Sequence, residues 1–240
     1  MKVLLSAILV SFLTSACTKG ENMSEIYPNN HIPTSASATV KTYLALGDSY
    51  TIGESVKQSE SFPFQLKSML QNEGLNVNNP KIIATTGWTT NELQNAIAQA
   101  NIVQKFDFVT LLIGVNNQYR GGSIDTYKKE FSELLRTAIS FANGDKKKVF
   151  VVSIPDWGIT PFGKNSGRDI QIIATEIDKF NNVNRQITLA EGISYTDITP
   201  GSRKASADLS LIANDGLHPS GKMYAEWATV LQPKVSTVIK

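Results

Sequence analysis

Residues 108–116 read FVTLLIGVN, a near-continuous apolar run that ends in glycine, valine and asparagine. Such a run is typical of a strand that is buried on both faces of a parallel sheet. Shorter apolar runs occupy residues 43–46, 82–84, 149–154 and 193–196. We therefore expect five short strands within one domain.

Segments with helical periodicity separate these runs. Apolar residues recur at helical spacing in residues 62–73, 124–139 and 170–190, and a closing helix is expected to begin near Ser220. Residues 89–92, Thr-Thr-Asn-Glu, have the form of a capping box and predict the start of another helix. This alternation predicts an α/β fold in which helices cover both faces of a mainly parallel, five-stranded sheet.

Length, composition and charge fit one globular domain. The chain has 240 residues, of which 41% are hydrophobic, enough for one sizeable core. The formal net charge is +2 and no basic stripe is present, so a nucleic-acid partner is not expected. We expect a monomer.

The first residues resemble an export signal. Lys2 precedes an apolar run over residues 3–13, which is too short to span a bilayer as a stable helix, and Cys17 follows three small residues. We expect residues 1–16 to be a lipoprotein-type signal peptide and Cys17 to carry the lipid. Thr14 departs from this pattern, since leucine is usual there, and an ordinary secretory signal is the alternative.

The remaining chain divides into two parts. Residues 17–38 are rich in Ser, Thr, Asn and Pro and predict a flexible tether, and residues 39–240 form the folded domain. Cys17 is the only cysteine, so no internal disulfide is possible. We expect an exported cell-envelope lipoprotein, facing the periplasm or the outer surface, that touches the membrane through its lipid anchor only. A secreted or periplasmic protein is the alternative.

Residues suited to acyl transfer follow the predicted strands. Ser49, Gly87 and Asn116 come just after the first three strands, and Asp215 and His218 precede the last helix. Ligands of such sheets gather at the carboxyl ends of the strands, so the first three residues should share one rim. The final loop can bring the other two to it.

The histidine count narrows the choice of a general base. The chain has two histidines, and His31 lies in the predicted tether. His218 is therefore the candidate base that takes the proton of the Ser49 hydroxyl, and Asp215 is the candidate that orients the imidazole. A lone histidine can also be purely structural. Asp48 is expected to cap the turn beneath Ser49, with a second catalytic carboxylate as the alternative.

Four blocks in this order carry a resemblance to a known family. They are Gly47-Asp48-Ser49-Tyr50, Gly87, Gly114-Val115-Asn116 and Asp215-Gly216-Leu217-His218-Pro219. Over residues 42–232 the chain resembles the SGNH (GDSL-type) hydrolase superfamily of esterases and lipases. Its fold would then be the flavodoxin-like, three-layer α/β/α sandwich of that superfamily. Tyr50 stands where leucine is usual, and Asn117 where many members have aspartate.

The resemblance also implies roles for single residues. Ser49 would be the nucleophile, His218 the base and Asp215 its partner. The backbone amides of Ser49 and Gly87 and the side chain of Asn116 would form the oxyanion hole. No cofactor is expected, and the sequence shows no His and Cys cluster with metal-ligand spacing.

We therefore expect a serine ester hydrolase that acts on carboxylic esters through an acyl-enzyme. Its substrate would be a small or polymer-borne acyl ester, such as an acetylated carbohydrate, a lysophospholipid or a short-chain acyl ester. Trp88 and Trp157 are candidate substrate-lining residues, although both could equally be partly buried aromatics of the rim. A non-catalytic glycan- or lipid-binding lipoprotein and an acyltransferase are the alternatives on the same fold.

Overall fold

The computed structural model describes residues 39–240. The predicted signal peptide, the lipidation of Cys17 and the predicted tether lie outside these residues and stay predictions. Among the helices of residues 39–240, none combines the length and the apolar character that crossing a membrane requires.

One sheet of five parallel strands forms the centre of the fold, in the order β2-β1-β3-β4-β5. The strands are β1 (Tyr43–Gly47), β2 (Lys81–Ala84), β3 (Phe108–Leu112), β4 (Val149–Val152) and β5 (Ser194–Thr196). This is the flavodoxin-like strand order, in which the order of the strands across the sheet reverses between β1 and β3. The predicted α/β fold and its five strands are confirmed, and the pairing is parallel throughout.

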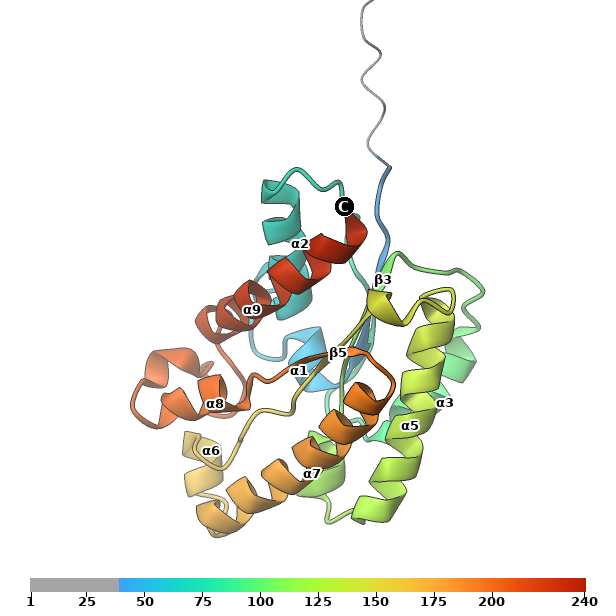
Figure 1. Cartoon of the computed structure of the whole chain (residues 1–240). Coiled ribbons are helices and arrows are strands. Elements are labelled where there is room, and N and C mark those ends of the chain that lie inside the picture. The colour runs from blue at the N-terminus through green and yellow to red at the C-terminus, as the bar shows by residue number, and fades with distance from the viewer. Residues whose placement is uncertain (1–38) are drawn as a thin grey trace, which may run out of the picture. The chain divides into compact units, whose positions relative to one another are not determined.

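Helices cover both faces of this sheet (Figure 1). One layer contains α3 (Thr90–Ala100), α5 (Ile124–Phe141) and α7 (Ile170–Ala190). The other contains α2 (Phe62–Asn72), which packs along α9 (Gly221–Ile239). Four short helices lie in the loops: α1 (Ser49–Ile52), α4 (Val115–Tyr119), α6 (Pro161–Lys164) and α8 (Thr199–Ser202).

The apolar periodicity seen in the sequence becomes the buried face of each long helix. In α5 the buried residues include Tyr127, Phe131 and Leu134, which lie on the predicted stripe. Helix α3 begins with the predicted capping box: the Thr89 side chain accepts from the Glu92 backbone, and the Glu92 carboxylate accepts from the Thr89 N–H at 2.7 Å. The apolar stripe of α5 and the capping box of α3 therefore stabilise these helices independently of the candidate active site.

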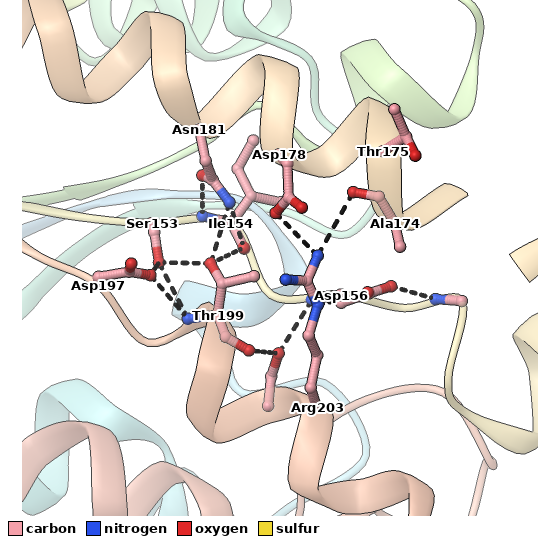
Figure 2. Close-up of polar contacts among 12 residues, drawn as sticks. Ser153, Ile154, Asp156, Ala174, Thr175, Asp178, Asn181, Asp197, Thr199 and Arg203 are labelled. Carbon is pink, nitrogen blue, oxygen red and sulfur yellow. Dashed lines mark hydrogen bonds and ion pairs between the residues drawn. The ribbon is translucent and has the colours of Figure 1, made fainter. Parts of the chain in front are cut away.

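The strand predicted at residues 149–154 ends at Val152, because side chains bind the backbone of the next residues (Figure 2). The Ile154 N–H donates to Asn181 Oδ1 at 2.8 Å, and Asn181 Nδ2 donates to the Ile154 carbonyl at 2.9 Å. Asn181 Nδ2 also donates to Thr199 Oγ1 at 3.0 Å. These bonds tie the end of β4 to α7 and α8.

The loop after β4 is held by a buried carboxylate (Figure 2). Asp156 Oδ2 pairs with Arg203 Nε at 2.9 Å, and Asp156 Oδ1 accepts from the Gly158 N–H at 2.9 Å. Arg203 also binds Asp178 on α7 at 2.8 Å. Because Trp157 lies between Asp156 and Gly158, this network fixes the backbone that presents the Trp157 ring.

We expect Asn181→Ala to lower the free energy of unfolding by about 2–4 kcal/mol, because it leaves a buried N–H and a buried carbonyl unpaired. Urea denaturation, monitored by circular dichroism, measures this change in the free energy of unfolding. The neighbouring Asn182 is exposed on the same helix, so Asn182→Ala should change stability by less than about 0.5 kcal/mol. Equal losses in the two variants would contradict the role of Asn181 at the end of β4.

Candidate active site

The candidate nucleophile lies in a tight turn at the end of β1. Ser49 begins α1 and is 4% exposed. The predicted cap is confirmed, since Asp48 Oδ1 accepts from the Tyr50 N–H at 3.0 Å. A Cβ at Gly47 would collide with Thr51 Oγ1 and with the carbonyl oxygen of Leu112 on β3. Glycine at this position therefore lets the turn lie against β3, with Ser49 at the carboxyl-terminal end of the strands.

The loop before α9 holds the candidate base and its carboxylate together. His218 Nδ1 and Asp215 Oδ2 form a hydrogen bond of 2.5 Å. The other carboxylate oxygen, Asp215 Oδ1, accepts from the N–H groups of Leu217 at 2.9 Å and His218 at 3.0 Å. The His218 side chain is 9% exposed and that of Asp215 is 29% exposed. The imidazole is thus buried and fixed through Nδ1, which leaves Nε2 for a second partner.

Main-chain bonds close this loop on itself. The Ala213 N–H donates to the His218 carbonyl at 2.8 Å, and the Ser220 N–H donates to the Leu211 carbonyl at 2.8 Å. The Phe162 N–H in α6 donates to the Gly216 carbonyl at 2.9 Å, which joins the loop to the opposite wall. The loop therefore presents His218 from a defined backbone.

The charge state of Asp215 suits an orienting role. Partial burial alone raises the pKa of Asp215, but the hydrogen bonds from His218, from the Leu217 N–H and from Ser55 outweigh it and hold the pKa at about 2. Asp215 is therefore ionised at neutral pH. An ionised carboxylate fixes the tautomer of its imidazole partner and stabilises the imidazolium.

Ser49 and His218 line the same pocket, together with Gly87 and Asn116. The Tyr50 ring packs beside the imidazole, with ring centres 5.6 Å apart. Within residues 39–240 the structure shows no hydrogen bond that joins Ser49 to His218. Catalytic hydrogen bonds often tighten only when substrate is bound, so a missing bond does not rule out His218 as the base.

The loops that carry the candidate oxyanion donors bind each other. Asn116 Nδ2 donates to the Trp88 carbonyl at 3.0 Å, which orients the amide and leaves its second N–H free of that bond. Arg120 Nη2 donates to the Gly87 carbonyl at 2.6 Å. Arg120 also pairs with Glu92 of the α3 capping box at 3.1 Å. Gly87 and Asn116 are thereby held next to each other at the ends of β2 and β3.

Asn117 has a structural contact that an aspartate could not reproduce. It is buried, and its Oδ1 accepts from the Thr90 N–H at 3.0 Å, while its Nδ2 donates to Thr90 Oγ1 at 2.7 Å. The Thr90 hydroxyl in turn donates to Glu130 on α5. Because the Thr90 hydroxyl donates its proton to Glu130, its oxygen accepts from residue 117, and an ionised aspartate there would have no proton to donate.

Apolar side chains form most of the pocket, whose volume is about 180 Å³. Trp157 lies in the wall with its Nε1 bonded to Gln118 Oε1 at 2.7 Å. The rings of Tyr119 and Phe162 lie 5.2 and 6.1 Å from the Trp157 ring, and both line the pocket while remaining exposed to solvent. Phe162 is not among the residues predicted from the sequence, because its only signal is an aromatic residue in a short loop helix.

Trp88 does not line this pocket. Its side chain packs against the hydrophobic core, and its contribution to the site is the backbone carbonyl that binds Asn116. The residues of the pocket are Ser49, Tyr50, Thr86, Gly87, Val115, Asn116, Tyr119, Trp157, Phe162, Leu217 and His218. In residues 39–240 no group of three or more His, Cys, Asp or Glu side chains is arranged to hold a metal ion.

Solved structures similar to this chain share its fold. A lipase/acylhydrolase from Enterococcus faecalis matches with a TM-score of 0.65 at 18% identity, over 82% of this chain and 96% of that chain. TesA matches with a TM-score of 0.63 at 16% identity, over 82% of this chain and 99% of the other. An acetyl xylan esterase from Geobacillus stearothermophilus, Axe2, matches with a TM-score of 0.62 at 18% identity, over 81% and 94%.

A comparison with curated proteins found no match. The model of the GDSL-like lipase/acylhydrolase family, in contrast, matches residues 45–226, which include the turn of Ser49 and the loop of Asp215 and His218. The chain therefore belongs to the GDSL-like lipase/acylhydrolase family, a family of ester-bond hydrolases.

Proposed function

We propose that this chain is a serine esterase that cleaves carboxylic esters of apolar acyl groups through an acyl-enzyme intermediate. The observation that carries the proposal is that His218, hydrogen-bonded to Asp215, lines the same apolar pocket as Ser49. A hydroxyl becomes a nucleophile when a neighbouring base takes its proton, and this pocket supplies both groups.

The reaction has two steps of the same kind. Ser49 Oγ attacks the acyl carbonyl while its proton passes to His218 Nε2, and His218 then protonates the leaving alcohol as the ester C–O bond breaks. Water next attacks the acyl-enzyme, gives its proton to His218, and releases the acid as Ser49 regains a proton. In both steps the charge on the carbonyl oxygen would be stabilised by the amides of Ser49 and Gly87 and by Asn116.

The pocket favours an apolar group on one side of the ester. Its wall of Val115, Trp157 and Leu217 and its rim of Tyr119 and Phe162 present carbon atoms to a bound substrate. Such a surface gains from burying methylene groups, each of which contributes about 0.8 kcal/mol. We propose that this pocket holds the acyl chain and that the chain is longer than acetyl.

Asp48 is a second carboxylate close to Ser49. Unlike Asp215, it is fully buried. It lies beneath α1, and its Oδ2 has no hydrogen-bond partner within residues 39–240. Burial raises the pKa of Asp48 to about 7, although the bond from the Tyr50 N–H lowers it. The fold therefore shifts Asp48 toward the neutral form relative to an exposed aspartate, whereas orienting a histidine requires an ionised carboxylate.

We expect Ser49→Ala to reduce hydrolysis of p-nitrophenyl butyrate by roughly a thousandfold or more, because the acyl-enzyme cannot form. Release of p-nitrophenol measures the rate. Ser68 lies on the exposed face of α2, so Ser68→Ala is the matched control and should keep the wild-type rate. Substantial turnover by the Ser49→Ala variant would rule out this nucleophile.

We expect Phe162→Ala to reduce kcat/KM for p-nitrophenyl octanoate by about tenfold and to change that for the acetate ester by less than about twofold, because only the long chain reaches the rim. Leu189→Ala removes an apolar side chain of similar exposure from the last turn of α7 and serves as the control. A uniform loss on both esters would show that Phe162 does not contact the acyl chain.

We expect Asp48→Asn to stabilise the protein relative to wild type at pH 8 but not at pH 4. The pKa of Asp48 is raised from about 4 in the unfolded chain to about 7 in the fold. The stability that neutral Asp48 contributes is thus complete below about pH 4 and is lost as pH rises through 7. The difference between the two proteins should grow by roughly 4 kcal/mol between pH 4 and pH 8, because the pKa differs by about three units.

Urea denaturation at a series of pH values between 4 and 8 measures this difference. Asp145→Asn is the matched control, because Asp145 is an exposed cap that accepts from the backbone N–H two residues later, as Asp48 does. Its difference from wild type should stay flat. A flat difference for Asp48→Asn as well would contradict the neutral form.

A further inference from the structure

The segment after the nucleophile turn is rigidly joined to Ser49. The N–H groups of Gly53 and Glu54 both donate to the Ser49 carbonyl at 3.1 Å. The next residue, Ser55, has a φ of +64°, in the left-handed region that residues other than glycine, asparagine and aspartate seldom adopt. A serine in this conformation is less favourable than a glycine, so its side chain is the feature to explain.

That side chain contacts the carboxylate of the acid–base pair. Ser55 Oγ donates to Asp215 Oδ2 at 2.7 Å, across 160 positions of the chain. Asp215 Oδ2 is the oxygen that bonds His218 Nδ1, while Asp215 Oδ1 takes two backbone N–H groups of its own loop. Within residues 39–240, Ser55 is the one hydrogen-bond partner that Asp215 has outside that loop.

The same turn also reaches the loop that carries Gly87. Glu54 accepts a hydrogen bond from the hydroxyl of Thr86, which lines the pocket one residue before Gly87. Glu54 and Ser55 thus join the nucleophile turn to two different loops of the site. The Ser55–Asp215 bond joins residues that are farther apart in the sequence than Glu54 and Thr86, because the loop before α9 lies near the C-terminal end of the chain.

We propose that Ser55 is a positioning residue for the reaction: its hydroxyl fixes Asp215, and through Asp215 the imidazole of His218, relative to the turn that carries Ser49. The inference rests on the proposed serine esterase function. It accounts for the strained backbone, because the left-handed turn is what brings the hydroxyl to Asp215 Oδ2. It also implies that Ser55 acts on the rate of the chemical step and little on substrate binding.

The test uses two variants that both lack the hydroxyl but differ in backbone strain. Ser55→Gly suits the positive φ, and Ser55→Ala keeps the strain. We expect kcat for p-nitrophenyl butyrate to fall roughly tenfold in both, with KM changed by less than about twofold, since a hydrogen bond to a charged group is lost. We expect the Tm of Ser55→Gly to equal or exceed that of the wild type.

A second readout follows Ser49 without relying on ester turnover. A fluorophosphonate reacts covalently with an activated serine, and peptide mapping by mass spectrometry locates the label. We expect the labelling rate of Ser49 to fall about as much as kcat in both Ser55 variants, and Ser68→Ala to match wild type.

The outcomes separate the two claims. If Ser55→Gly retains the wild-type kcat and labelling rate, or if the losses follow Tm instead of the missing hydroxyl, Ser55 has only a structural role and the inference is overturned. If wild-type Ser49 is not labelled, or if Ser49→Ala still turns over ester, the proposed function itself fails and the inference fails with it.

Discussion

The parallel pairing of β1 with both of its neighbours is the constraint on which the rest of the site depends. Gly47 aligns with Ala84 on β2 and with Leu112 on β3, so three strands end at one level. The loops that follow reach Ser49, Gly87 and Asn116 within a few residues of those ends. The candidate nucleophile and the candidate oxyanion donors are therefore placed by sheet register, and little is left for flexible loops to arrange.

The candidate base His218 and its carboxylate partner Asp215 are placed by a different means. Their loop does not follow directly from the end of β1, β2 or β3. It is closed by its own main-chain hydrogen bonds and is followed by α9, which packs on α2. Asp215 carries a full charge at this position because hydrogen bonds to both of its oxygens outweigh its partial burial. Asp48 is fully buried and has no such set of donors, so its pKa is raised to about 7. Two carboxylates near one serine thus differ in pKa because they differ in burial and in hydrogen-bond donors.

Local patterns predicted much of this molecule. Strand positions, the capping box at Thr89 and the cap at Asp48 follow from short-range rules that a single sequence contains. The strand order does not, because many orders are compatible with the same alternation of strands and helices. Tertiary contacts likewise decided the orientation of Trp88, the recruitment of Phe162 to the pocket and the end of β4 at Val152. Ser55 gave no signal in the sequence, since neither its backbone conformation nor its distant partner is encoded in neighbouring residues.

The most direct test of this account is to trap the acyl-enzyme. Wild-type protein is mixed with p-nitrophenyl butyrate, quenched in acid during turnover and mapped by peptide mass spectrometry. The account predicts a butyryl group on Ser49, carried by the peptide that contains Gly47 and Asp48, in an amount that rises and falls with turnover. Continued hydrolysis with no acyl group on Ser49, or with the acyl group on another residue, would contradict it.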